Sequence, residues 1–149
     1  MRNLTLLIIL IFYGMTSKAQ DLQQYQWQNR IIVLYANETE LDLLTMQLEL
    51  LTEEPNELSE RKLLVIQAHK DRYKIIFPEN SEWVSSSLKD ELKISVETEF
   101  EVFLLGLDGG IKLRQQEIVQ TEKLFSLIDG MPMRKAEIRR KDQDPEIIL

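Results

Sequence analysis

The sequence predicts an α/β protein with a four-stranded mixed sheet flanked by helices. Three runs of β-branched and apolar residues, at 30–36, 62–68 and 101–107, have the composition of strands buried on both faces. A helical spacing of leucines separates the first two runs, and a glycine turn at 108–110 follows the third. The strand–helix–strand order favours a parallel pair, and the short turn favours an antiparallel pair.

The first half of the predicted domain is a strand, a helix and a second strand. The strand at 30–36 leads into Asn37, which can cap a helix over residues 38–52. Acidic residues in the first turn of that helix suit its dipole. Residues 53–60 contain a proline and are expected to form a loop or short turn before the strand at 62–68.

The middle of the chain is less regular up to the hairpin. Residues 69–81 suit a short edge element or a packed loop. Residues 82–93 place apolar side chains on one side of an expected helix. The strand at 101–107 then returns through the glycine turn as an antiparallel strand at 111–114.

Two helices are expected after the hairpin. Thr121 can cap the first, and Pro132 can open a further short helix through about residue 141. The complete order is β-α-β-α-β-β-α, which is the order of a thioredoxin-like fold. We therefore predict one such domain over residues 20–141, with a flexible tail at 142–149.

The first nineteen residues have the three-part pattern of a secretory signal peptide. Arg2 gives a positive start, Leu4–Tyr13 is apolar, and small residues precede a predicted cleavage after Ala19. The apolar run is about half of the roughly 20 residues that span a bilayer, so an uncleaved anchor is the alternative interpretation. The mature protein is expected in the periplasm or outside the cell, with no stable membrane insertion.

Composition excludes several kinds of chemistry. The chain has 149 residues, a net charge of −7, one histidine and no cysteine. The lack of cysteine excludes disulfides, zinc–thiolate sites, iron–sulfur clusters and thiol catalysis. A single histidine disfavours a histidine-rich metal centre, and the acidic balance disfavours nucleic acid as a partner. No cofactor is expected.

Three segments resemble one known family. They read Leu22-x-x-Tyr25-x-Trp27-x-x-Arg30, Asp108–Arg114 (DGGIKLR) and Leu124–Arg134 (LFSLIDGMPMR) with Glu137 one turn later. In these segments the chain resembles the domain of unknown function 4174 family, over nearly all of residues 20–141. The resemblance implies a small exported bacterial protein with a thioredoxin-like fold, distantly similar to peroxiredoxins, whose activity is not established.

The position of a thioredoxin's dithiol holds no comparable nucleophile in this chain. The junction of the first strand and first helix, residues 36–41, reads ANETEL, and the approach to the third strand, residues 95–100, lacks proline. Dithiol exchange and cysteine peroxidase chemistry are therefore excluded. Thr39 is interpreted as a residue of the helix start.

His69 and three acidic groups are the remaining catalytic candidates. His69 could act as a base beside a serine, but the chain has no Gly-x-Ser-x-Gly elbow, so a histidine at a strand end is the simpler interpretation. Glu97, Glu99 and Glu101 could serve acid–base chemistry or calcium, but no calcium-binding loop pattern is present. Solvated charge is the simpler interpretation of these carboxylates.

The candidate binding surface comprises Lys112, Arg114, Arg134 and Trp27. Lys112 and Arg114 alternate with apolar residues and fall on one face of the returning strand. With Arg134 they could form an anion site if the closing helix lies across the hairpin. Trp27 could stack on a ligand or seal an edge of the sheet.

The last segment is locally basic and contains a Met-Pro-Met sequence. Its cations either suit the helix dipole and lie against the acidic body, or dock an acidic partner, envelope polymer or lipid. Met131 and Met133 either pack into the core or form an adaptable contact patch.

The leading hypothesis is an exported, non-catalytic thioredoxin-like module that binds an unknown protein or envelope partner. One alternative is an envelope enzyme of a non-thiol type, centred on His69 or the acidic groups. A second is an accessory protein in oxidative-stress protection that acts through a partner. The partner and the oligomeric state stay open.

Overall fold

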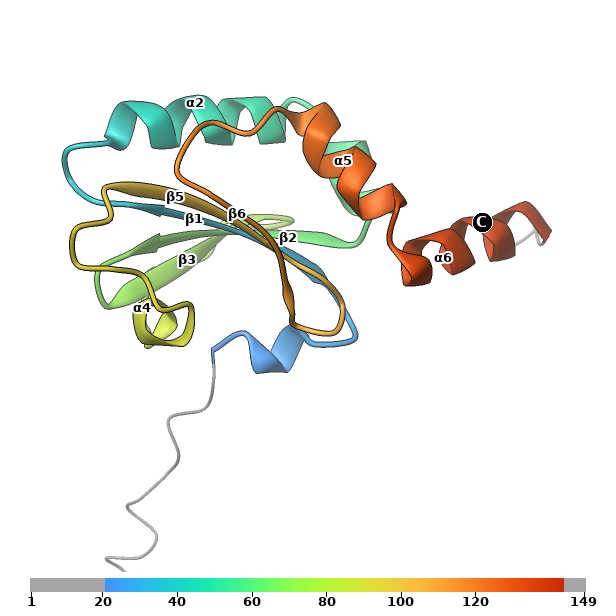
Figure 1. Ribbon diagram of the computed structural model, residues 1–149, viewed down its shortest axis with the longest axis horizontal. Coiled ribbons are helices and arrows are strands. Elements are labelled where there is room, and N and C mark those ends of the chain that lie inside the picture. The colour runs from blue at the N-terminus through green and yellow to red at the C-terminus, as the bar shows by residue number, and fades with distance from the viewer. Residues whose placement is uncertain (1–20, 144–149) are drawn as a thin grey trace, which may run out of the picture.

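The computed structural model describes residues 21–143 (Figure 1). The predicted signal peptide at 1–19 and residues 144–149 of the predicted tail lie outside the described residues. The strands are β1 (Arg30–Ala36), β2 (Leu63–His69), β3 (Arg72–Phe77), β4 (Val84–Ser85), β5 (Phe100–Leu105) and β6 (Ile111–Gln115). The helices are the 3₁₀ turn η1 (Gln23–Tyr25), α2 (Leu41–Thr52), α3 (Pro55–Glu60), α4 (Leu88–Glu91), α5 (Thr121–Asp129) and α6 (Pro132–Gln143).

The strands form one mixed sheet in the order β4-β3-β2-β1-β5-β6. At its centre β1 is parallel to β2 and antiparallel to β5, and β5 is antiparallel to β6. These four strands and the βαβ and hairpin connections are the predicted thioredoxin-like arrangement. The sheet has six strands rather than four, because β3 and β4 extend it antiparallel beyond β2.

The prediction of a helix over residues 82–93 is largely wrong. This stretch contains β4 and the single turn α4. One carboxylate oxygen of Asp21 accepts hydrogen bonds from the Ser86 hydroxyl at 2.8 Å and from the Ser87 backbone N–H at 2.7 Å. Bonds of this kind offer the backbone an alternative to a helix, which explains why the serine run ends the strand and delays the helix.

Other element boundaries also differ from the predicted ones. α2 begins at Leu41, and Asn37 accepts the Thr39 backbone N–H at 3.0 Å in a turn before the helix instead of capping it. The expected loop after α2 contains α3, with Pro55 in its first turn, where a missing N–H costs nothing. Thr121 is the first residue of α5 and not its cap.

The sheet is buried on both faces. Helices α2, α3 and α5 cover one face, and α4 and η1 lie against the other (Figure 1). Every residue of β1 and β5 is buried, as the apolar runs predict. Because side chains alternate along a strand, Ile32 packs in the same cluster as Leu124 of α5, whereas Val33 packs in the same cluster as Leu88 of α4.

Helix α6 extends from the body and is anchored at its first turns by charge (Figure 1). Arg134 is 5% exposed and contacts Glu60 at 2.9 Å, Asp129 at 3.2 Å and Glu137 at 3.5 Å. Arg30, which is fully buried at the start of β1, bonds both oxygens of Glu137 at 3.2 and 3.3 Å. We call these five residues the α6 anchor. Ion pairs therefore fix the position of α6. An amphipathic helix would instead be held by packing of an apolar face.

Replacing Arg134 by alanine is expected to lower the free energy of unfolding by about 3 kcal/mol, because it leaves partly buried carboxylates without their cation. Arg139→Ala is the matched control on the same helix: Arg139 is exposed, so a change below about 0.5 kcal/mol is expected. Urea unfolding followed by circular dichroism measures both variants. An equal decrease in the free energy of unfolding in the two variants would contradict a stabilising role for the α6 anchor.

Candidate functional site

The junction between β1 and α2 is the position of the dithiol in a thioredoxin, and here its polar side chains form local hydrogen bonds. His69 Nδ1 lies 2.9 Å from the carbonyl oxygen of Ala36, and its Nε2 lies 4.0 Å from the Glu38 carboxylate. The Thr39 hydroxyl bonds to Asn37 Oδ1 at 2.6 Å. No hydroxyl among residues 21–143 is hydrogen-bonded to His69, so the nucleophile that a Ser-His-Asp site needs is not in place there.

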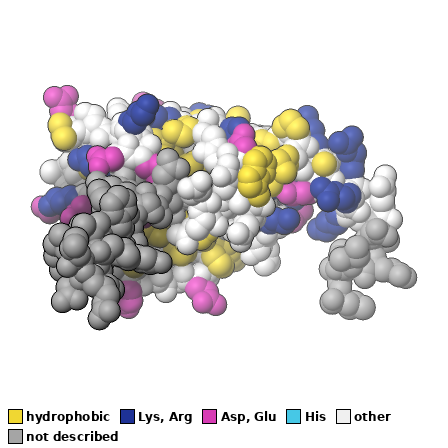
Figure 2. All heavy atoms as spheres, turned by 90° about the horizontal axis from the view of Figure 1, so that it is seen from below, with side chains coloured by type: hydrophobic (Ala, Val, Ile, Leu, Met, Phe, Trp, Pro, Cys, Tyr) yellow, Lys and Arg dark blue, Asp and Glu magenta, His cyan; other side chains and the backbone are white. Residues whose placement is uncertain are grey.

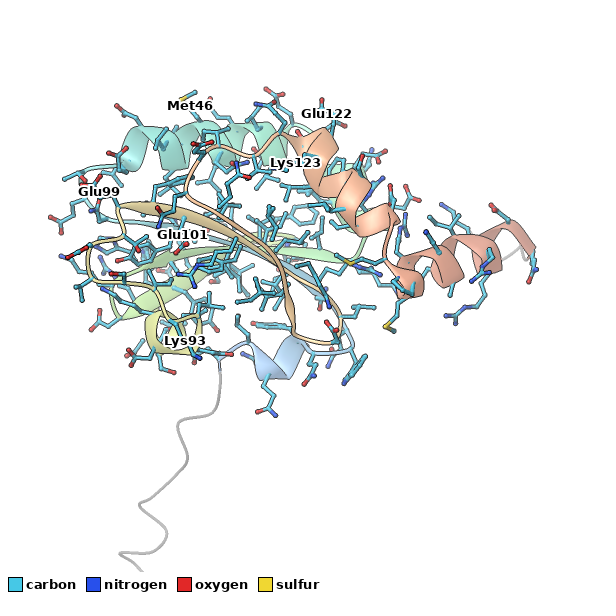
Figure 3. All side chains as sticks on the ribbon, viewed as in Figure 1. Met46, Lys93, Glu99, Glu101, Glu122 and Lys123 are labelled. Carbon is cyan, nitrogen blue, oxygen red and sulfur yellow. The ribbon has the colours of Figure 1, made fainter. Side chains whose placement is uncertain are left out.

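The acidic groups near the third strand lie in two environments. Glu97 and Glu99 are exposed, and Glu99 lies at the end of the sheet beside the start of α2 (Figure 3). Glu101 is 2% exposed, and its carboxylate accepts hydrogen bonds from Arg114 Nε at 2.6 Å and from Arg114 Nη2 at 3.0 Å. Glu101 is therefore the buried half of an ion pair. Within the described residues, no group of three or more histidine or acidic side chains is placed to hold a metal ion.

Arg114 and Arg134, two cations of the candidate binding surface, are held in separate ion pairs. Besides Glu101, Arg114 donates to the two carbonyl oxygens that follow α4, whereas Arg134 belongs to the α6 anchor. They have no described partner in common, and the structure does not bring them together with Lys112 around one anion. The alternation of the strand predicts which side chains share a face, but it cannot reveal the carboxylates opposite them.

The hairpin and the start of α6 do lie side by side, and they form the walls of a groove of about 310 Å³. Its lining consists of Arg30, residues 106–108, Lys112 and residues 131–133. We call this feature the hairpin groove. Each of the three segments with the family resemblance contributes to it, although they are far apart in the sequence. Its exposed lining is predominantly apolar, supplied by one leucine, two methionines and a proline.

Two cations of the groove are already partly neutralised. Lys112 Nζ donates to Asp108 at 2.8 Å, and this bond, with one from the Gly110 N–H, lowers the pKa of the Asp108 carboxyl below its usual range. The terminal nitrogens of Arg30 bond Glu137, and one of them also donates to the Arg61 carbonyl at 3.0 Å. Arg30 Nε is buried and has no acceptor among the described residues.

Trp27, the fourth residue of the candidate surface, lies next to the groove. Its backbone N–H donates to the carbonyl of the groove residue Leu107 at 2.7 Å, and its side chain is 62% exposed. Its φ of +66° is an uncommon conformation for a large side chain. The neighbouring Gln26 amide secures this turn by donating to the Asp108 carbonyl at 2.8 Å. Trp27 therefore presents its ring to solvent from a fixed backbone beside the hairpin.

The Met-Pro-Met sequence combines the two roles that were open for it. Met131 is half-buried and packs against the core, whereas Met133 is 45% exposed and lines the groove. The sequence indicated a possible contact patch at the two methionines but did not connect it with the hairpin. The groove has walls from segments far apart in the chain, and no local pattern shows that they meet.

A second cavity, of about 220 Å³, shares Gly106 and Asp108 with the hairpin groove. Glu91 of α4 lines it. Burial raises the pKa of Glu91, although backbone N–H groups of the N-terminal segment at Leu22 and Asp21 donate to it. Its Oε2 is buried without a partner among the described residues. Ionisation of this carboxylate therefore destabilises the folded protein.

Fold and site together define the class: a thioredoxin-like domain that has no cysteine at its redox position and that carries an apolar groove elsewhere. The chain belongs to the family described as "Domain of unknown function (DUF4174)", whose model matches residues 21–137. No curated protein matches it. Among solved structures it is similar to the mitochondrial 2-cys peroxiredoxin from Plasmodium falciparum, with a TM-score of 0.49, 8% identity and coverage of 86% of each chain. A likeness this distant says nothing about the activity of this chain.

Residues 21–143 contain no helix with the length and hydropathy needed to cross a bilayer.

Replacing Glu91 by glutamine is expected to raise the midpoint of urea unfolding at pH 7. Because the pKa of Glu91 is higher in the folded than in the unfolded state, its ionisation removes stability as the pH rises above the ordinary value of 4.5. The advantage of the variant should therefore disappear below about pH 4. Glu97→Gln, at an exposed position, is the control. It should leave the midpoint of urea unfolding unchanged both at pH 7 and below pH 4. An advantage of Glu91→Gln that persists unchanged at pH 3.5 would contradict this account.

Proposed function

We propose that this protein is an exported, non-catalytic thioredoxin-like module that binds a protein partner through the hairpin groove. The observation that carries the proposal is the convergence of the three family-like segments on one apolar groove, away from the redox position. The proposed export is supported by the signal pattern of residues 1–19. The lack of any cysteine supports a role without thiol chemistry.

The exposed side chains around the groove suit a protein interface. Trp27 is 62% exposed, Ile111 is 47% exposed and Met133 is 45% exposed. Tryptophan is enriched among the residues that dominate binding energy, and methionine adapts its shape to different partners. Because Met133 directly precedes the anchored Arg134, the groove wall is held in place before binding, which reduces the entropy lost on association.

A non-thiol enzyme has less geometric support. His69 is fixed by a backbone carbonyl and faces the exposed carboxylate of Glu38. A His69→Ala variant is therefore expected to keep the physiological activity of the protein. An accessory role in protection against oxidants is compatible with the binding module, since such a role would act through a captured partner.

The test is a crosslinking capture from the envelope fraction of the producing cells, with mature protein from Gln20 as bait. Met133→Asp is expected to abolish capture, because a carboxylate in an apolar groove cannot be desolvated without a partner. Met46→Asp is a matched control: Met46 is 53% exposed on α2, and it does not line the groove (Figure 3). It should leave capture unchanged.

The outcomes separate the hypotheses. A partner captured by the natural sequence and by Met46→Asp, but not by Met133→Asp, supports the binding module. Equal capture by all three baits contradicts the assignment of the groove as the interface. Substrate turnover by the purified protein that His69→Ala abolishes would contradict the non-catalytic role.

A further inference from the structure

We infer that the hairpin groove takes an acidic, extended polypeptide segment that inserts one apolar side chain. This inference rests on the proposed function and names the chemistry of the partner. Four observations carry it: the lining of the groove, the distribution of charge around it, the unsatisfied nitrogen of Arg30 and the open edge of β6.

The lining calls for an apolar anchor. The exposed lining of this space of about 310 Å³ is mainly apolar, and Leu107, Met131, Pro132 and Met133 are its apolar side chains. An apolar side chain that enters it replaces water against these groups, and the flexible methionine can close around residues of different shapes. A wholly polar segment would lose its hydration there without gaining enough hydrogen bonds.

The charge beside the groove calls for acidic residues on either side of the anchor. Helix α6 carries five basic and two acidic side chains, and the Lys and Arg side chains gather at its end of the molecule (Figure 2). Within the described residues, Lys135, Arg139 and Arg140 form no ion pair, and all three are exposed. The residues before this segment are strongly acidic, with 21 acidic and 11 basic side chains over 20–130. An acidic segment is therefore attracted to α6, whereas residues 20–130 carry a net negative charge that disfavours it.

Arg30 supports an occupant that carries acceptor oxygens. It is fully buried, it lines the groove, and its Nε has no acceptor among the described residues. A buried donor without a partner is unfavourable, and both backbone carbonyls and carboxylates of a bound segment are acceptors. A purely hydrocarbon ligand would fill the apolar lining without satisfying this nitrogen.

The edge of the sheet supports an extended conformation. β6 is last in the strand order, so its outer edge has no strand partner among the described residues, and its first residues adjoin the groove. An extended segment can pair with such an edge through its backbone. Lys112 and Arg114 discourage pairing with a basic or a second identical edge, but they suit an acidic strand.

Fluorescein-labelled peptides of defined sequence test the chemistry. EDELEDE has acidic flanks and an apolar centre, EDESEDE lacks the apolar anchor, and KRKLKRK reverses the charge. Fluorescence anisotropy with the mature protein should show EDELEDE binding at least about tenfold more tightly than either of the others. Raising the salt from about 50 to about 200 mM should weaken that binding severalfold, because the flanking contacts are exposed.

Three variants locate the binding. Met133→Asp should abolish binding of EDELEDE, and the double variant Arg139→Glu/Arg140→Glu should weaken it about tenfold, since both changes add negative charge where the peptide carries it. Met46→Asp should leave it unchanged. Circular dichroism of each variant confirms that it is folded. Amide shifts in NMR titrations at millimolar peptide detect weak binding at residues 106–112 and 131–133.

Several results would overturn the inference. They are equal binding of all three peptides, preference for KRKLKRK, no NMR shifts at the groove at millimolar EDELEDE, or binding to phosphatidylglycerol vesicles without binding to EDELEDE. The proposed function fails separately. If Met133→Asp abolishes capture of the envelope partner while EDELEDE does not bind, the binding module stands and only the acidic-peptide chemistry is wrong. If capture is indifferent to Met133→Asp, the proposed interface itself is wrong.

Discussion

The buried guanidinium of Arg30 is the constraint on which the rest of this end of the molecule depends. A desolvated arginine is tolerated only with good partners, and here the partner is Glu137 of α6, which binds two of its nitrogens. That pair joins the first residue of β1 to the last helix. The position of α6, and with it one wall of the hairpin groove, follows from the need to neutralise a charge in the core.

The charged and the apolar residues of the family-like closing segment thus have different places in the structure. Its charged residues Asp129, Arg134 and Glu137 are held in ion pairs with one another and with Arg30, Glu60 and Arg61. Its apolar residues around Pro132 line the groove. A specific sequence motif can therefore be structural in its charges and available for binding in its apolar side chains, which is the reverse of the assumption that charged residues mark the ligand site.

The two ends of β1 lie at two different features of the fold, the β1–α2 junction and the hairpin groove. Ala36, its last residue, leads into the position where a thioredoxin is reactive, and Arg30, its first residue, lines the hairpin groove. Seven residues of extended chain span roughly 20 Å. A binding role at the groove consequently places no demand on the residues of the β1–α2 junction, which here are a turn stabilised by Asn37 and the backbone contact of His69.

The sequence by itself determined the central sheet and the lack of thiol chemistry. Continuous apolar runs such as 30–36 are locally encoded, because burial on both faces needs apolar residues at every position. Only the tertiary structure decided the rest. The fate of residues 82–93 depended on the distant Asp21 carboxylate, and the roles of Arg114 and Arg134 depended on carboxylates up to 74 residues away. Contacts between segments so distant in sequence leave no periodic signal in the chain, so the groove emerged only when the hairpin and the start of α6 were placed side by side.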